Sequence, residues 1–433
     1  MLSRLRRLGI RREESAAVGW SWLFFFAVLS AYYVIRPIRD DMGVASGVES
    51  LPWLFAGSLA GTVAANPIVA FFASRLSRAR FVVLAYGFFA LNLVVFYFVL
   101  RSASTDQELW TGRVFFIWTS VFNMFVVSIF WSVITDVFSV DQGQRLFGMI
   151  AAAGTIGSIT GAALTSWLVR PLGAANLLLV SAALLQVAVF AALRLFRFAA
   201  AGSNGQARLS LQEQSTAMGG SVWEGARRTA SHPYFLNVAA HMVLFTVLTT
   251  FLYFQQAELV DQAITDRAER TRFFANIDLL VNVIALATQM FATGWFIRVF
   301  GVTAGLVFLP LASVFGFAAL ALLPTVSVLM AVQVIRRASN FAVNRPAREI
   351  LFTVGSPRDR YKTKAFIDTF VYRAGDQLGA WVYAPLVALG LGVSGTSLIA
   401  GGLGILSVLN AVWLGRRFQH HNAASPAQPA RRV

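Results

Sequence analysis

The sequence predicts an all-α polytopic membrane protein, and three observations lead to that fold class. Hydrophobic residues make up 57% of the 433 positions, above the usual share in a soluble domain. Charged residues make up only 13%. Apolar runs of about 20 residues, the length of helix that crosses a bilayer, recur along the whole chain. We therefore expect helices that span a membrane and a bilayer as the chain's surroundings.

Twelve segments have the length and composition of a membrane span, and one long polar connection separates the sixth from the seventh. The expected spans are 18–36, 51–73, 81–100, 113–137, 147–169, 172–194, 235–257, 273–297, 300–323, 325–350, 364–390 and 393–415. The polar connection predicts a cytoplasmic linker. The expected parts are a six-helix half (1–197), the linker (198–232), a second six-helix half (233–418) and a disordered tail (419–433).

The distribution of basic residues predicts the orientation. Arginine and lysine gather before span one, between spans two and three, around the linker, between spans ten and eleven and after span twelve. The alternate loops are poorer in them and hold acids instead: Asp40, Asp41, Glu49, Asp106, Glu108, Glu258 and Asp261. The positive-inside rule then places both termini in the cytoplasm. This asymmetry accounts for most of the net charge of +16 without a nucleic-acid partner.

Several kinds of chemistry are disfavoured by the residues present. The chain has no cysteine, which removes disulfides and thiolate chemistry, and its four histidines have no metal-ligand spacing. We expect no enzyme activity, no metal and no cofactor. The stretch GTIGSITGA, residues 154–162, imitates a phosphate-binding loop but lies inside an apolar helix. Small residues at such spacing usually allow two helices to pack closely.

The two halves show a weak internal repeat. Asn123 to Ser139 and Asn340 to Ser356 are segments of equal length, and Gly161 and Gly379 keep nearly the same offset. We take spans four and ten as equivalent, and the halves as parallel repeats. Two six-helix halves joined by a cytoplasmic linker form the major facilitator architecture, in which substrate binds near the membrane midplane between the halves.

The stretch RRASNFAVNRPAREI, residues 336–350, places four arginines in an expected span. In a helix, Arg336, Asn340, Asn344 and Arg348 share one face, with Arg337 beside them. Because an arginine that faces lipid is costly, this stripe is expected to face a water-filled cavity or a carboxylate. Arg345 and Arg348 lie near the end of this span. For them the alternative is that their side chains extend to the cytoplasmic interface or take part in a structural contact.

A second basic pair, Arg36 and Arg39, lies at the outer end of span one, where Pro37 is expected to break the helix. The alternative role for this pair is an ion pair with Asp40 and Asp41.

Other intramembrane charges are candidates for coupling or for internal ion pairs. They are Asp136 in span four, Asp278 in span eight, and Asp368, Arg373 and Asp376 in span eleven. Arg373 and Asp376 are one helical turn apart, the spacing of an ion pair. A carboxylate in such a place accepts a proton during transport or pairs with an arginine.

Four of these segments resemble the ATP/ADP translocase family, the nucleotide exchangers of intracellular bacteria and plastids. The segments are Tyr-x-x-x-RPIRD, FWSVITDVFSVDQGQRLFG, SNFAVNRPAREILF and YKTKAFIDTFVYRAGDQLGAW. The resemblance implies a major facilitator-like exchanger of nucleoside phosphates. By position, Arg39 stands where the family typically has a lysine, and Lys362 and Lys364 match its Lys-x-Lys-Ala stretch. The chain departs from the family at Asp376, where a lysine is common, and in span seven, which lacks an acid in its apolar part.

Three functions remain open from the sequence. The first is a secondary active transporter, an antiporter for a nucleotide or another organic anion, with Arg36, Arg39 and the stripe at residues 336–348 as binding residues. The second is a proton-coupled carrier of a neutral or cationic compound, which relies on the acids. The third is a membrane scaffold or lipid-handling protein. We expect a monomer in a bacterial inner membrane.

The expected orientation is testable because the chain contains no native cysteine. A single cysteine introduced at Ser203, in the expected cytoplasmic linker, should react with a membrane-impermeant thiol reagent only in inverted vesicles. Labelling of the same variant in intact cells would reverse the predicted topology.

Overall fold

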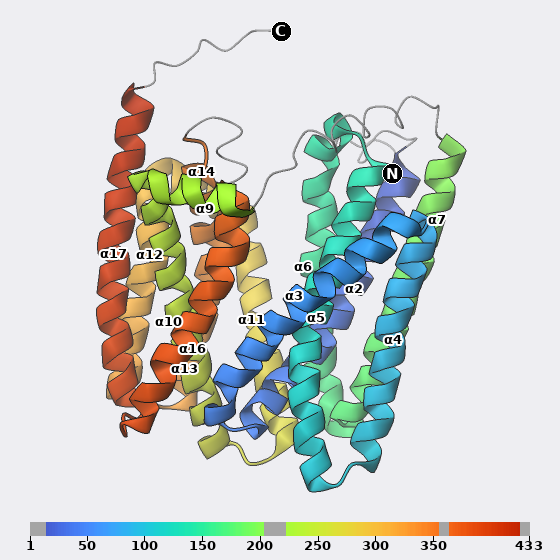
Figure 1. Cartoon of the computed structure of the whole chain (residues 1–433), viewed down its shortest axis with the longest axis horizontal. Helices are drawn as coiled ribbons and strands as arrows, with labels where there is room; N and C mark the ends of the chain where they lie inside the picture. Colours follow the sequence, from blue (N-terminus) through green and yellow to red (C-terminus); the bar gives the residue numbers. More distant parts are fainter. Residues whose placement is uncertain (1–13, 203–221, 355–362, 425–433) are drawn as a thin grey trace. The chain divides into compact units, whose positions relative to one another are not determined.

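A computed structural model describes residues 14–202, 222–354 and 363–424, and all regular elements in these ranges are helices (Figure 1). Eleven helices of the described ranges are long and apolar enough to cross a membrane. The all-helical, polytopic class predicted from composition is confirmed. The predicted linker and tail lie partly outside the described residues, at 203–221 and 425–433.

The remaining expected span, 364–390, is also helical but more polar. Its helix contains a π-helical turn, η3 (Ile367–Val371), followed by α16 (Tyr372–Ala388). α16 has only 17 residues. Lys364, Asp368, Arg373 and Asp376 make this segment less apolar than the other spans.

The described helices fall into two compact units. The first unit comprises residues 1–218 and 264–282, and the second comprises 219–263 and 283–433. The helix α11 (Arg267–Phe291) is therefore shared between them, its first part in unit one. The domain boundaries expected from the sequence at 197 and 233 stay a prediction.

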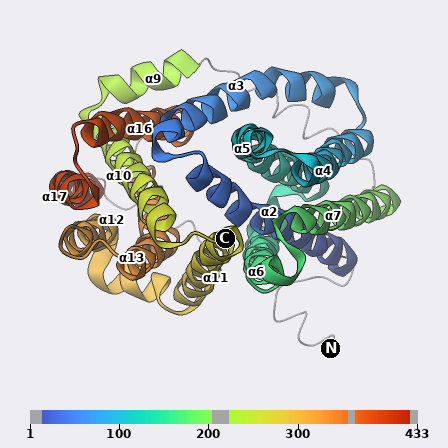
Figure 2. The same ribbon diagram turned by 90° about the horizontal axis from the view of Figure 1, so that it is seen from below.

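The first unit is built around α2 (Ser15–Ala45), which packs against α5, α6 and α7 (Figure 2). Its other helices are η1 (Val48–Ser50), α3 (Leu51–Arg75), α4 (Arg78–Ser102), α5 (Thr105–Val137), α6 (Val140–Leu172) and α7 (Ala174–Gly202). The aromatic side chains of Phe24, Phe25, Tyr86 and Phe130 fill the space between these helices.

The prediction that Pro37 breaks the first span is wrong. The helix α2 passes through Pro37 and ends only at Ala45. A proline removes one backbone hydrogen bond, and helices packed around a buried segment compensate for that loss. As a result Arg36 and Arg39 lie in one continuous helix, on either side of Pro37.

Small residues let α6 approach α2 closely, as the glycine spacing predicted. Gly154, Gly157 and Gly161 face α2, and a Cβ at any of them would collide with Phe25 or with the backbone of Phe26 or Ser30. The hydroxyl of Ser30 donates to the carbonyl of Gly157 at 3.1 Å. The GTIGSITGA stretch is thus confirmed as a helix-packing surface.

The second unit contains the same kind of close helix packing as the first unit. Its elements are α9 (Val222–Ser231), α10 (Pro233–Ala263), the end of α11, α12 (Thr293–Leu322), α13 (Val326–Ser339), η2 (Asn340–Asn344), α14 (Arg345–Leu351), η3, α16 and α17 (Val393–Ala424). α10 packs against α16 and α17. Gly375 and Gly379 of α16 face Thr246 and Thr250 of α10. Spans one and five therefore pack like spans seven and eleven.

The tenth span is a single irregular helix. α13, the π-helical turn η2 and α14 follow one another without a break, so the polar stretch at 336–350 lies in a helix. A π turn leaves carbonyl groups without their usual partners. Gln289 donates to the Phe341 carbonyl at 2.9 Å, and Thr293 donates to the Ala342 carbonyl at 2.7 Å.

The close contact between α2 and α6 allows us to predict how a larger residue on α6 changes the stability of the protein. Gly157→Ala should destabilise the protein by about 1–3 kcal/mol, because the new methyl group meets the Phe26 backbone. Gly148→Ala on the same helix is the matched control, since open space surrounds Gly148. Thermal unfolding of purified protein measures both. Equal midpoints for the two variants would contradict the packing described here.

Candidate functional site

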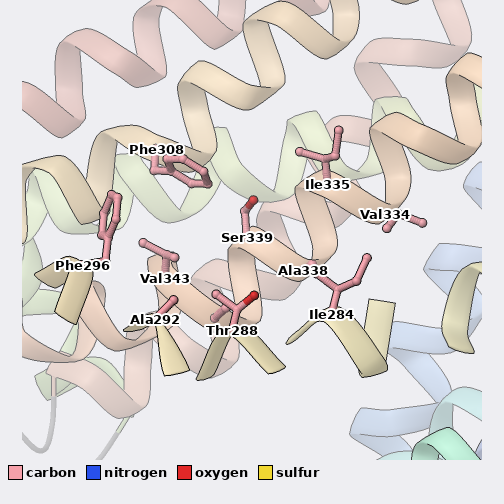
Figure 3. Close-up of a pocket in the computed structure, with 11 residues that line it drawn as sticks. Ile284, Thr288, Ala292, Phe296, Phe308, Val334, Ile335, Ala338, Ser339 and Val343 are labelled. Atoms are coloured by element: carbon pink, nitrogen blue, oxygen red, sulfur yellow. The ribbon is translucent and has the colours of Figure 1, made fainter. Parts of the chain in front are cut away.

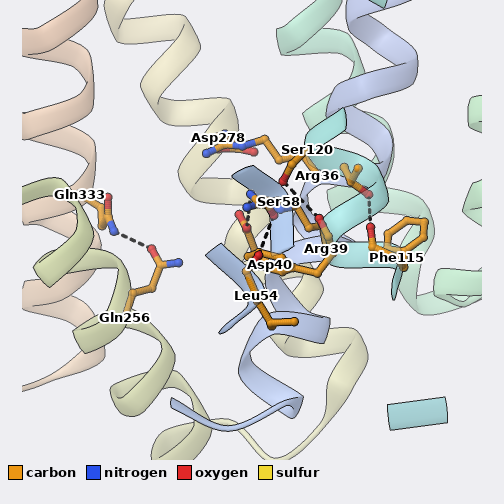
Figure 4. Close-up of polar contacts among 12 residues, drawn as sticks. Arg36, Arg39, Asp40, Leu54, Ser58, Phe115, Ser120, Gln256, Asp278 and Gln333 are labelled. Carbon is orange, nitrogen blue, oxygen red and sulfur yellow. Dashed lines mark hydrogen bonds and ion pairs between the residues drawn. The ribbon is translucent and has the colours of Figure 1, made fainter. Parts of the chain in front are cut away.

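The first unit contains a buried ion pair between Arg36 of α2 and Asp278 of α11 (Figure 4). Only 18% of the Arg36 side chain and 1% of the Asp278 side chain are exposed. The guanidinium of Arg36 also lies 5.6 Å from the centre of the Tyr33 ring. Arg36, a candidate for substrate binding, and Asp278, a candidate for coupling or an internal ion pair, thus neutralise each other although they are 242 positions apart in the sequence.

Arg39, one turn further along α2, is less fully satisfied. Its guanidinium lies 4.0 Å from the centre of the Phe116 ring, and one terminal nitrogen is 3.3 Å from Asp40. The Nε of Arg39 is buried and has no hydrogen-bond partner among the described residues. Arg36 and Arg39 therefore place two guanidinium groups one turn apart in the same helix, and one of them retains an unused donor.

Asp41 is held by arginines that the sequence reasoning missed. Its two oxygens accept from Arg267 at 3.2 Å and from Arg270 at 2.9 Å, and only 2% of its side chain is exposed. Arg267 also pairs with Glu108. Both arginines begin α11 and lie more than 220 residues from Asp41 in the chain. Since no local pattern links positions so far apart, the sequence carried no signal for this cluster.

In the second unit, Arg336 of α13 is buried, with 4% of the residue exposed. Its Nε donates to the hydroxyl of Ser313 at 2.8 Å, and a terminal nitrogen lies 3.4 Å from the carbonyl oxygen of Leu248. The Phe317 ring centre lies 5.6 Å from the guanidinium. No carboxylate lies within ion-pair distance of Arg336 in the described part of the chain.

The other residues of the predicted polar stripe at 336–348 differ in how exposed they are. Asn344 and Arg348 are buried, whereas Arg337 and Asn340 are partly accessible. Arg348 pairs with Asp368 at 3.3 Å, which joins α14 to η3. The amide of Asn344 donates to Asn340 at 3.1 Å. Arg337 and Asn340 are therefore more exposed than Asn344 and Arg348.

Buried amides form further polar contacts in the second unit that the sequence analysis did not select. Gln333 of α13 donates to Gln256 of α10 at 2.7 Å (Figure 4). Gln255 donates to Thr396 and Ser397 of α17, each at 3.0 Å. Gln255 and Gln256 both lie near the end of the expected span seven.

The remaining predicted residues lie apart from these clusters. Asp136, at the end of α5, pairs with Arg78 at 2.9 Å, and both side chains are substantially exposed. Arg373 and Asp376 are partly buried one turn apart on α16, and the backbone carbonyl of Asp376 lies 3.3 Å from the Thr250 hydroxyl. Lys364 pairs with Glu349. Lys362 lies outside the described residues.

A groove of about 280 Å³ in the second unit is a poor candidate for the site of an anion (Figure 3). It is formed by the ends of α11 and α12 together with α13 and η2. Its lining residues are Ile284, Thr288, Ala292, Phe296, Phe308, Val334, Ile335, Ala338, Ser339, Ala342 and Val343. None of these side chains carries a charge.

Comparisons with known proteins agree with this architecture. No protein-family model matches the chain. It is 21% identical to ADP,ATP carrier protein 2 of Chlamydia pneumoniae, over 91% of this chain and 86% of that protein. The resemblance predicted from four segments is confirmed as a distant match.

Two solved structures cover almost the whole chain. One is a bacterial homologue of the human lysosomal transporter Spinster, with 14% identity, a TM-score of 0.62, and coverage of 97% of this chain and 100% of that one. The other is the nucleoside transporter NupG, with 16% identity, a TM-score of 0.59, and coverage of 95% and 99%. The chain has the major facilitator-like transporter fold.

At these identities the solved structures establish the fold of this major facilitator-like protein and leave its substrate open. The predicted fold is confirmed, and the chain is a multi-pass membrane protein. Its binding residues remain candidates, selected by their position in the spans and by their contacts.

The buried pair of Arg36 and Asp278 should behave as a coupled unit. Arg36→Gln alone leaves a buried carboxylate without its cation, which costs about 3–5 kcal/mol, and Asp278→Asn alone has the opposite defect. The double variant should be more stable than the sum of the two losses implies. Thermal unfolding of the four proteins measures the coupling, and additive losses would show that the two residues act independently.

Proposed function

We propose that this protein is a secondary active transporter of an organic anion that works by alternating access. The major facilitator-like fold and the distant match to an ADP,ATP carrier support this proposal. The observation that carries it is the guanidinium of Arg39 inside α2, which lies one turn from the Arg36–Asp278 ion pair and whose Nε has no hydrogen-bond partner among the described residues.

Guanidinium groups suit phosphate and carboxylate ligands. Each offers a planar set of donors that binds two oxygens at once, and burial strengthens such charge-assisted hydrogen bonds. In the second unit, Arg337 and Asn340 are the accessible polar residues of the stripe, and we assign them direct contacts with the substrate. Arg336, Asn344 and Arg348 are buried and, in this proposal, support that surface from inside the unit.

The proposed substrate class is a nucleotide or another phosphorylated metabolite, and the proposed mode is exchange. The distant relative is an ADP,ATP carrier protein, which favours adenine nucleotides. The two departures from the family pattern, Asp376 and the missing acid in the apolar part of span seven, favour a different phosphorylated cargo. The proposed location is a bacterial inner membrane with both termini in the cytoplasm and the protein acting as a monomer.

The contacts of Asp278 and Asp368, two of the four acids predicted for this role, argue against a proton-coupled carrier of neutral or cationic compounds. Asp278, Asp368 and Asp136 each lie in an ion pair with an arginine. An acid that binds a transported proton must lose such a partner during each cycle, and that loss is costly for a buried carboxylate. We therefore advance the anion transporter alone.

Counter-flow uptake into proteoliposomes tests the proposal. Vesicles preloaded with ATP, ADP, a sugar phosphate, a dicarboxylate or an amine are offered the same labelled compound outside. We expect accumulation for at least one phosphorylated compound. Arg39→Gln should raise the half-saturating concentration roughly ten- to a hundredfold, the effect of losing a charge-assisted hydrogen bond.

Two controls make the result decisive. Arg101→Gln changes an exposed arginine of α4 that contacts only Tyr97 in the described structure, so it should transport like the native protein. Arg39→Lys retains the charge but not the planar donors and should be impaired less than Arg39→Gln. Uptake of the amine with none of the anions, or identical kinetics for Arg39→Gln and Arg101→Gln, would contradict the proposed function.

A further inference from the structure

The helix α11 belongs to both compact units. Residues 264–282 lie in the first unit, although the chain on either side, 219–263 and 283–433, lies in the second. α11 is nevertheless continuous from Arg267 to Phe291, and it contains no proline, glycine or π-helical turn. Sharp bends in helices occur at such features. α11 therefore moves as one rod, and one of its two sets of contacts must break if the two units move apart.

Ion pairs hold the first part of α11 to α2 and α5. Arg267 and Arg270 donate to the carboxylate of Asp41, at 3.2 and 2.9 Å. Arg267 also pairs with Glu108 of α5. Asp41 is buried, so it depends on these two arginines for its opposite charge. The beginning of α11 is therefore joined to the first unit by charge.

Further polar contacts continue along the same part of α11. Glu269 pairs with Arg170 of α6, and the hydroxyl of Ser166 donates to the side chain of Asn276 at 2.6 Å. The ion pair of Asp278 with α2, described above, follows (Figure 4). We call these contacts of residues 267–278 with α2, α5 and α6 the α11 clasp.

The second part of α11 is attached to other helices. Gln289 donates to the carbonyl of Phe341 in η2 at 2.9 Å. Ile284 and Thr288 line the apolar groove together with residues of α13 (Figure 3). The whole of span eight also falls in the expected second half, 233–418. The clasp therefore fastens a part of the second half to the first unit.

The ion pairs at the start of the clasp are suited to opening. Arg267, Glu108, Glu269 and Arg170 are all accessible to solvent, and ion pairs that solvent reaches are individually weak. A cavity of about 300 Å³, lined in part by Arg267 and Glu108, borders them. Few packing contacts therefore oppose a separation at this place.

We infer that the α11 clasp is a gate of the transport cycle. In the state described here it holds α11 on the first unit, and it opens when α11 moves with the rest of the second half. The inference rests on the proposed function, because alternating access is the process that requires the two halves to move relative to each other. Asp41 and Glu108 lie in segments predicted to face outward, so we place the gate at the outer end of the protein.

A disulfide across the clasp tests the inference, because the chain contains no native cysteine. Ser166→Cys and Asn276→Cys replace two small side chains in direct contact, the proximity that a disulfide requires. The reduced double variant should retain counter-flow of the phosphorylated compound that the native protein takes up. Oxidation should abolish this exchange, and reduction of the disulfide should restore it.

A second crosslink keeps the test decisive if that variant folds poorly. Arg170→Cys and Glu269→Cys lie at solvent-accessible positions of α6 and α11, and a short bismaleimide joins them. The bridged protein should lose exchange. The same variant treated with N-ethylmaleimide, which modifies both cysteines without joining them, should retain it.

The matched control joins two helices that lie wholly in the first unit. Val34→Cys of α2 and Thr165→Cys of α6 are close together, since the Thr165 hydroxyl donates to the Val34 carbonyl at 3.0 Å. Oxidation of this pair should leave exchange unchanged, because α2 and α6 move as one body.

Complete crosslinking of either clasp pair with unchanged exchange would overturn the inference, because the first part of α11 would then be a fixed member of the first unit. Equal loss of exchange on oxidation of the control pair would also overturn it, since the effect would not be specific to the clasp. A native protein that exchanges none of the offered compounds contradicts the proposed function instead, and that result appears before any crosslink is made.

Discussion

The cost of placing charge inside a membrane protein governs much of this structure. A guanidinium or carboxylate in a low-dielectric interior must have an opposite charge, several hydrogen bonds or access to water. Arg36 meets this requirement with Asp278, Arg348 with Asp368, and Asp41 with two arginines of α11. The exceptions are therefore informative. Arg39 pairs with Asp40 but keeps a buried Nε that has no hydrogen-bond partner among the described residues, and Arg336 has no carboxylate within ion-pair distance in the described part of the chain.

Close helix packing provides the frame that holds these charges. In the first unit, glycines of α6 lie against the backbone of α2, and in the second unit, glycines of α16 lie against α10. Small residues at these positions bring helix backbones together where lipid offers no hydrophobic drive for association. Because α2 carries Arg36 and Arg39, its tight contact with α6 also fixes the position of the proposed anion-binding groups.

Two π-helical turns lie in the polar part of the second unit. The turn η2 begins at Asn340, three residues after Arg337, and η3 contains Asp368. Such turns are rare and often occur at functional sites, because they shift side chains around the helix axis and free backbone carbonyls. Here the pairing of Arg348 with Asp368 joins the segments that carry the two turns, so the two irregular spans are linked by charge as well as by packing.

The sequence by itself determined the features that depend on local composition and spacing. Apolar runs predicted the helices, the glycines of residues 154–162 predicted close packing, and four segments predicted the distant relative. The tertiary structure alone decided which charges meet. Asp41 and Arg270 are 229 positions apart, and Arg36 and Asp278 are 242 apart, so no periodicity relates them. The same holds for Pro37, through which α2 continues as far as Ala45. Spacing along a chain reports which face of a helix a residue occupies, but only packing decides what that face meets.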